Sequence, residues 1–145
     1  MSRYSPHCLL ILNLLCSPML AAAPRTDYGS VRIDEVGSIF DGDTIRVTIR
    51  AWPAVAGARI PVRLYGIDTP EMSDKRPRVY KLARSAKQFS VAQLRGAKRI
   101  ELRQIRRDKY FRLLAEVWVD GRNLSELLLN AGLAKPYFGG KKISW

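Results

Sequence analysis

The sequence DGDT at positions 41–44 separates two strand-like runs and sets the strongest constraint on how this chain folds. Asp-Gly is a frequent turn dipeptide, so a turn is expected here. In the run that follows, Ile45, Val47 and Ile49 alternate with polar residues, which is typical of a half-buried strand. Asp43 has the same parity as these apolar residues, so its carboxylate is predicted to point inward. A carboxylate in that position needs a partner, which the rest of the chain must supply.

The remaining sequence predicts more short strands with two inserted helices. Strands are expected over residues 30–40, 43–52, 58–68, 98–105 and 112–121, with loops over 52–57 and 69–78. Apolar residues at helical spacing predict a helix over 79–95, capped by Gly96. Asn123 and Glu126 form a capping-box pattern for a short helix that ends at Gly132. This order favours an α+β fold, a five-stranded OB-type barrel with two or three helices, although sandwiches and SH3-like barrels also use short strands.

The charge of the chain points to a polyanionic partner. There are 25 Lys and Arg residues against 13 Asp and Glu, which gives a net charge of +12. Such a charge attracts polyanions at long range. Nucleic acid is the most common partner of this kind, and an anionic membrane surface or an acidic polysaccharide is an alternative.

The first residues have the pattern of a secretory signal peptide, with one Arg, an apolar run and a small-residue end. We therefore expect residues 1–23 to be removed after Ala22 or Ala23, with an uncleaved anchor as the alternative. Cys8, Cys16 and His7 would leave with this segment. The mature protein would be exported to the periplasm or outside the cell, without stable membrane insertion. It would have neither a disulfide nor the thiol or imidazole of cysteine–histidine and serine–histidine hydrolases.

A second cluster of polar residues lies in the sequence RLYGIDTPE at positions 63–71. Asp68 could meet Asp43 at the ends of neighbouring strands, and two carboxylates in one partly buried place repel each other unless a cation lies between them. Oxygen ligands without Cys or His favour calcium or magnesium over zinc. Glu71 could activate a water molecule, and Arg63 could neutralise a phosphate oxygen. Asp41 is interpreted as a turn residue only.

The sequences DGDT, RLYGIDTPE and DKYFR resemble the three active-site motifs of the staphylococcal nuclease (thermonuclease) family, in the same order and at similar separations. The resemblance covers residues 31–137, and GLAKPY at 132–137 is similar to a further segment of that family. It implies one domain over 28–140, followed by a short tail at 141–145. Phe111 departs from the pattern, because glycine stands at that position in the best-known form of the family.

The resemblance also implies roles for individual residues. One calcium ion would be held by Asp43, Asp68 and the backbone carbonyl of Thr69. The implied catalytic residues are Arg63, Glu71 and Arg112, with the two arginines clamping the phosphate and the glutamate acting on the attacking water. The nucleotide would lie against Lys109, Tyr110 and Tyr137.

The implied function is a secreted, monomeric, calcium-dependent nuclease that acts on DNA, with RNA as a second candidate substrate and without a protein partner. One alternative is a catalytically inactive OB-fold protein that binds single-stranded nucleic acid through a basic groove and aromatic residues. The other is a cationic surface protein without catalysis, which would leave Asp43 and Asp68 unexplained.

Overall fold

The computed structural model describes residues 27–141 and 144–145. The predicted signal peptide, with His7 and both cysteines, lies outside the described residues. Within the described part of the chain, no helix combines the length and the apolar character that crossing a bilayer requires.

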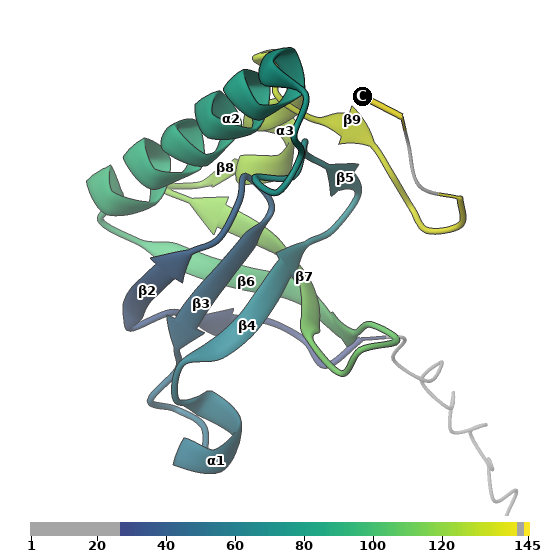
Figure 1. Cartoon of the computed structure of the whole chain (residues 1–145). Helices are drawn as coiled ribbons and strands as arrows, with labels where there is room; N and C mark the ends of the chain where they lie inside the picture. The colour runs from purple at the N-terminus through teal and green to yellow at the C-terminus, as the bar shows by residue number, and fades with distance from the viewer. Residues whose placement is uncertain (1–26, 142–143) are drawn as a thin grey trace, which may run out of the picture.

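A strongly curled sheet forms most of the molecule (Figure 1). Its strands are β1 (Val31–Arg32), β2 (Glu35–Ile39), β3 (Thr44–Thr48), β4 (Ile60–Leu64), β6 (Ile100–Arg107), β7 (Leu113–Val119) and β8 (Arg122–Asn123). They run in the order β1-β6-β7-β4-β3-β2, with β8 paired to β7. All neighbours are antiparallel except β4 and β7, which are parallel. A separate pair, β5 (Ile67–Asp68) and β9 (Lys135–Pro136), extends the molecule beside β4.

Three helices accompany the sheet: α1 (Ala54–Gly57), α2 (Pro77–Gly96) and α3 (Leu124–Asn130). Helices α2 and α3 lie together over one end of the curled sheet, and α1 lies at the opposite end (Figure 1). The predicted α+β class and OB-type architecture are confirmed, but the main sheet has seven strands and not the predicted five, since short strands β1 and β8 belong to it as well. The alternating residues of the strands fill the interior, where Ile45, Val47 and Val62 are fully buried.

Several predicted details differ from the structure. The expected loop over 52–57 contains α1, a single turn whose Gly57 amide donates to the carbonyl of Pro53. The third strand is divided, because Gly66 adopts a φ of 82° and separates β4 from β5. Gly96 is the last residue of α2 and not its cap, since the chain leaves the helix through an extended Ala97.

The short helix α3 begins as predicted. The Asn123 side chain accepts a hydrogen bond from the Ser125 amide at 2.9 Å. At the other end, Gly132 follows the helix with a φ of 67°, a conformation that glycine adopts without strain.

Two side-chain hydrogen bonds join the helices to the loops that form the site. The Ser90 hydroxyl of α2 donates to the Gly42 carbonyl at 2.7 Å, and the Ser125 hydroxyl of α3 donates to the Tyr65 carbonyl at 2.9 Å. Gly42 is closely packed, because a β-carbon there would lie 2.8 Å from Cγ2 of Thr69 and 2.9 Å from Cβ of Ala86. The DGDT turn is therefore held at a fixed place between α2 and β5.

Candidate phosphodiester-binding site

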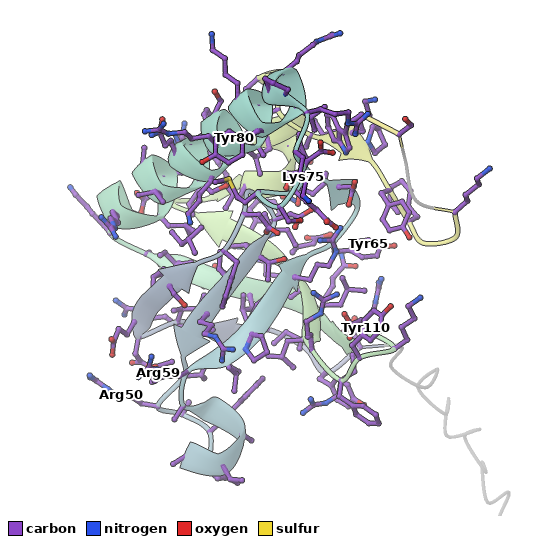
Figure 2. All side chains as sticks on the ribbon, viewed as in Figure 1. Arg50, Arg59, Tyr65, Lys75, Tyr80 and Tyr110 are labelled. Carbon is purple, nitrogen blue, oxygen red and sulfur yellow. The ribbon has the colours of Figure 1, made fainter. Side chains whose placement is uncertain are left out.

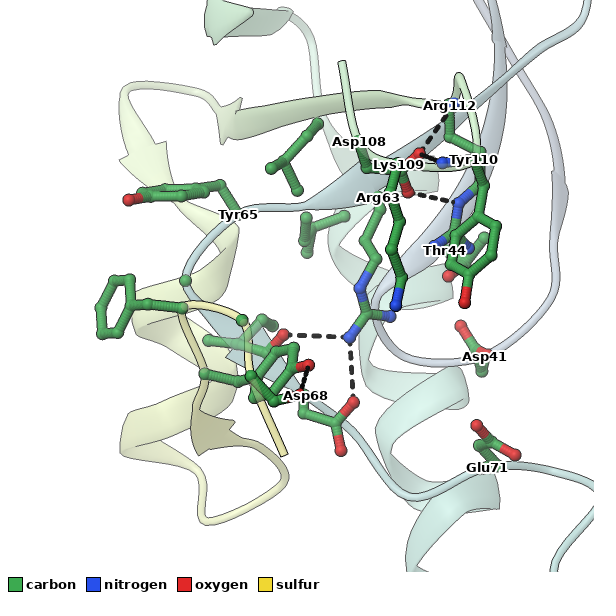
Figure 3. Close-up of a pocket in the computed structure, with 18 residues that line it drawn as sticks. Asp41, Thr44, Arg63, Tyr65, Asp68, Glu71, Asp108, Lys109, Tyr110 and Arg112 are labelled. Carbon is green, nitrogen blue, oxygen red and sulfur yellow. Dashed lines mark hydrogen bonds and ion pairs between the residues drawn. The ribbon is translucent and has the colours of Figure 1, made fainter. Parts of the chain in front are cut away.

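A groove of about 690 Å³ opens where β4, β5, the turn at 108–112 and the segment at 137–140 meet (Figure 3). Seven of the nine predicted site residues line it: Arg63, Asp68, Glu71, Lys109, Tyr110, Arg112 and Tyr137. The other two, Asp43 and Thr69, are buried beneath its floor. Segments that are far apart in the sequence thus bring all nine residues to one place.

Arg63 lies at the centre of this site. Its Nη1 donates to Oδ1 of Asp43 at 2.6 Å, and its Nη2 donates to Oδ1 of Asp68 at 2.9 Å. The same Nη2 also donates to the Ile67 carbonyl at 3.2 Å (Figure 3). One guanidinium therefore bridges two carboxylates, and their two negative charges exceed its single positive charge. Burial lowers the pKa of Arg63, but these two carboxylates outweigh that effect, so the group stays protonated.

Asp43 is held by three donors although it is almost completely buried, with 1% of its surface exposed. Besides Arg63, it accepts the Thr69 amide at 2.8 Å and the Thr44 hydroxyl at 3.1 Å. Burial raises the pKa of Asp43 from 3.8 to about 7, the charge of Arg63 opposes this, and the neighbouring Asp41 adds to it. A carboxylate with a raised pKa in a groove is a common mark of a functional site.

Asp41 is more than a turn residue, which makes its interpretation from the sequence incomplete. It lines the groove, and its carboxyl interacts directly with that of Asp43. Its Oδ1 and the Oγ1 of Thr69 are buried without a hydrogen-bond partner among the described residues. Such unsatisfied buried oxygens are rare in folded proteins, and each calls for an explanation.

These oxygens fit a hard cation in their chemistry. Carboxylate, hydroxyl and carbonyl oxygens are the donors that calcium and magnesium use. Over the ranges 27–141 and 144–145, however, no group of three or more Asp, Glu, His or Cys side chains is assembled as a metal site. The reason is visible in the geometry, because the Arg63 guanidinium stands between Asp43 and Asp68.

Asp108 orders the wall of the groove that carries Arg112. Its Oδ1 accepts the amides of Tyr110 and Arg112 at 2.8 and 3.0 Å, and its Oδ2 accepts Nε of Arg112 at 2.7 Å. Burial acts to raise the pKa of Asp108, but these hydrogen bonds outweigh it and hold the pKa below its ordinary value. Phe111 lies in the same turn with a φ of 60°, a conformation that accounts for the preference for glycine there. Phe111 is 80% exposed and does not line the groove.

Glu71 stands at the rim of the groove, on the loop between β5 and α2 (Figure 3). Its Oε2 accepts the Ser73 hydroxyl at 3.3 Å. On the opposite side, Tyr65 and Phe138 pack edge to face with their ring centres 5.7 Å apart, and Arg106 lies 4.6 Å above the Tyr65 ring. The groove therefore has an acidic rim on one side and an aromatic wall on the other.

Trp145 makes a contact with Asp68 that the sequence did not predict. Its indole Nε1 donates to Oδ2 of Asp68 at 3.1 Å, and Nζ of Lys135 lies 4.5 Å above its ring. Asp68 is thus bound by Arg63 on one oxygen and by Trp145 on the other. No local sequence signal could have revealed this contact, because the two residues are separated by 77 positions.

Comparison with known proteins agrees with this arrangement. A family model described as staphylococcal nuclease homologue matches residues 61–143, which include Arg63, Glu71 and Arg112 but not Asp43. SPbeta prophage-derived endonuclease YokF of Bacillus subtilis (strain 168) is 39% identical over 97 residues, which are 66% of this chain and 31% of that protein. Endonuclease YncB of the same organism is 37% identical over 97 residues, which are 66% of this chain and 43% of that protein.

A thermonuclease of Staphylococcus hyicus is 33% identical over 101 residues, which are 69% of this chain and 56% of that protein. The matched region therefore spans between about a third and three fifths of the length of these relatives.

Proposed function

Because this chain belongs to the staphylococcal nuclease family, we propose that it is an exported nuclease that hydrolyses phosphodiester bonds of DNA and RNA with the help of one calcium ion. The observation that carries the proposal is the bridge that Arg63 makes between two carboxylates at the floor of an open groove. A guanidinium binds carboxylates and phosphates through the same fork of donors. A phosphate that enters the groove can therefore compete for the nitrogens of Arg63.

Asp43, Asp68 and the Thr69 carbonyl would hold the ion, and the unsatisfied oxygens of Asp41 and Thr69 lie beside them. When bound, calcium would offset the charge of these carboxylates and polarise a phosphate oxygen. The site is rich in negative charge and poor in preassembled ligands, which suits the flexible coordination of calcium better than the strict octahedron of magnesium.

The arginines supply the groups that the reaction requires. A phosphodiester is anionic and gains charge in the transition state, so fixed cations lower the barrier to attack. Arg63 would bind the phosphate from the floor of the groove and Arg112 from its wall. Asp108 acts as a positioning residue, because its bond to Nε fixes how Arg112 enters the groove.

Glu71 would act on the attacking water. Its carboxylate lies on the rim of the groove, whereas the bridge of Arg63 to Asp43 and Asp68 lies at the floor. A positioned base of this kind contributes about 10²–10⁴-fold to a rate. Lys109 and Tyr110 from the turn, with Tyr137 from the facing segment, would contact the nucleotide.

The aromatic wall supports one alternative, a protein that binds single strands without cutting them. Phe138 is 74% exposed at the groove, and exposed rings with nearby arginines are typical of single-strand binding. The acids of the site argue for the nuclease, because Asp41, Asp43 and Asp68 would only weaken the binding of an anion in a groove without catalysis.

Cleavage of a labelled single strand in calcium, in magnesium and in chelator tests the proposal. The protein is expected to cleave in calcium, to cleave more slowly in magnesium and not to cleave in chelator. Asp68→Asn should raise the calcium concentration needed for half-maximal rate. Glu35→Gln, which removes an exposed acid of β2, is the control and should behave as the wild type. Full cleavage in chelator would remove calcium from the account, and binding without cleavage in every metal would establish the alternative.

A further inference from the structure

A second hollow, of about 330 Å³, lies on the outer face of α2. It is lined by Met72, Tyr80, Arg84, Lys87, Gln88, Val91 and Ala92. The helical members recur at spacings of three and four residues, so they form one face of the helix. The hollow adjoins the groove along the chain, because Glu71 lines the groove and the next residue, Met72, lines the hollow. We call this hollow, together with the neighbouring Lys81, the α2 site.

Helix α2 and the residues next to it carry charge of one sign. Residues 75–100 contain nine Lys and Arg and no Asp or Glu. Lys81 and Arg84 are exposed, and neither makes an ion pair with any residue that the structure describes. Their charges are therefore available to a ligand in solution.

The stability of the helix does not account for this pattern. The first turn of α2 has no acidic residue, although acids are favoured there by the helix dipole, and its N-cap Arg76 makes no capping hydrogen bond. Cations spaced three or four residues apart also repel each other along a helix. Acidic residues at some of these positions would stabilise α2, so the basic face points to a role in binding an anion.

The composition of the α2 site identifies the class of anion. The apolar residues of α2, among them Val79, Ala86 and Leu94, face the interior of the protein, and Tyr80 is the one large apolar side chain of α2 that is strongly exposed. A helix that lies on a membrane needs an exposed apolar face, which this one lacks. A ring at 41% exposure beside cations is instead the combination that binds a base and its phosphates.

We propose that the α2 site is a second binding site for single-stranded nucleic acid, which holds a strand that continues past the Glu71 rim of the groove. A base stacks on Tyr80 over the floor made by Met72 and Val91, while Lys81 and Arg84 bind the flanking phosphates. The inference rests on the proposed function only in its choice of substrate. Lys75, on the loop between β5 and α2, is a further exposed cation of this region (Figure 2).

Binding measured in chelator, where no cleavage is expected, tests this proposal. The probes are an oligothymidylate of roughly 30 nucleotides, about twice the largest site of a single OB fold, and a tetranucleotide. The double variant Lys81→Gln/Arg84→Gln should flatten the salt dependence of binding to the long strand by about 1.4 in log–log slope, since each contact to a single strand contributes about 0.7. The slope for the tetranucleotide should not change.

The matched control is Arg32→Gln/Arg50→Gln, which removes two exposed charges from elsewhere, with Arg50 at the end of the molecule opposite Tyr80 (Figure 2). It should keep the wild-type slope on both strands. Two results would show that only the general field of a cationic protein is involved, and that the proposal is wrong. One is an equal decrease in the salt dependence of binding by the control variant. The other is an equal decrease for the tetranucleotide and the long strand.

Tyr80→Ala tests the base contact separately. It should weaken binding of the long oligothymidylate by about 5- to 140-fold and leave the binding of an abasic strand of equal length unaffected. Equal affinity of Tyr80→Ala and wild type for the oligothymidylate would contradict the stacking. Vesicles of phosphatidylcholine and phosphatidylserine test the alternative that the α2 site binds a membrane. That alternative is established if the Lys81/Arg84 variant loses vesicle binding but keeps the wild-type salt dependence of binding to the long strand.

The outcome is independent of catalysis. If the Lys81/Arg84 variant alone loses salt dependence on the long strand but the wild type never cleaves, the nuclease is refuted and the α2 site stands. If the wild type cleaves but the Lys81/Arg84 variant keeps its salt dependence, the α2 site is refuted and the nuclease stands.

Discussion

Replacing Asp43 by Asn should make the protein more stable at neutral pH while impairing the calcium site proposed above. Burial raises the pKa of Asp43 from 3.8 to about 7 in the folded protein, and the unfolded chain has the ordinary value. Folding therefore favours the protonated carboxyl. The protonated Asp43 carboxyl therefore adds to the free energy of unfolding. This contribution is complete below about pH 4 and is lost as the pH rises through 7.

The size of the effect follows from the shift in pKa. At about 1.4 kcal/mol per unit, keeping Asp43 ionised in the folded state costs up to about 4 kcal/mol above pH 7. Asparagine resembles the neutral acid, so it removes this cost. Its amide group must, however, be placed beside the guanidinium of Arg63, and a poorly satisfied buried donor costs about 1–3 kcal/mol. The expected net gain is about 1–3 kcal/mol at pH 8.

Denaturant unfolding of the wild type and Asp43→Asn between pH 4 and pH 8 measures this gain. At pH 4 the variant should be the less stable protein, by about 1–3 kcal/mol, because only the cost of the amide remains. It should become the more stable protein as the pH rises through 7, with an unchanged m-value. At pH 8 the gain corresponds to a rise in Tm of roughly 4–12 °C for a domain of this size. Glu35→Gln, at an exposed acid, should not change the pH dependence. A variant that is equally stable at pH 8, or a gain that does not depend on pH, would refute the reasoning.

Three further predictions concern the reaction, the substrate and the packing. Glu71→Gln should bind a single strand as the wild type does but cleave it about 100-fold more slowly or worse in a single-turnover assay; near-normal turnover would remove Glu71 from the mechanism. Single strands should be cleaved faster than a stable duplex at low temperature, because the rings in the groove can stack unpaired bases, and equal rates would count against this. Gly42→Ala should lower the free energy of unfolding by about 1–3 kcal/mol, because its methyl would overlap Thr69 and Ala86. Gly96→Ala should raise the free energy of unfolding by about 0.5–1 kcal/mol, because a β-carbon there meets no other part of the protein within 4 Å and alanine favours the helix.

Local patterns in the sequence were sufficient to predict the main strands and the two longer helices. The alternation of the strand predicts that Asp43 faces inward with Ile45 and Val47. In the structure all three residues are buried. The cap of α3 at Asn123 was also predicted, because a capping bond joins residues that are near in sequence.

The details that escaped prediction depend on contacts between distant segments. The single turn of α1 has no apolar periodicity of its own, and its first intrahelical bonds return to Pro53. The break between β4 and β5 depends on Gly66, whose carbonyl accepts the amide of Tyr137 from the other end of the chain. In the same way, the hydrogen bond between Trp145 and Asp68 joins two distant segments, in the region where β5 pairs with β9.

The site shows the same division between local and distant information. The residue types of the motifs predict that their side chains form a single site, and in the structure most of them line a single groove. The bridge by Arg63 between two carboxylates was not foreseen, because the sequence suggested a phosphate as its partner and a cation between the acids. The second partner of a side chain with several donors is set by three-dimensional packing, which a linear motif does not record.

The central claim is that the groove around Arg63 hydrolyses phosphodiesters. Single-turnover cleavage of a labelled single strand by the wild type and by Arg63→Lys, at saturating calcium and in chelator, tests it most directly. Lysine keeps the positive charge between Asp43 and Asp68 but lacks the fork that binds two phosphate oxygens. The account predicts cleavage by the wild type in calcium only, and a rate at least about 100-fold lower for a folded Arg63→Lys protein. A wild type that leaves the strand intact in calcium, or an Arg63→Lys protein that cleaves at the wild-type rate, would contradict it.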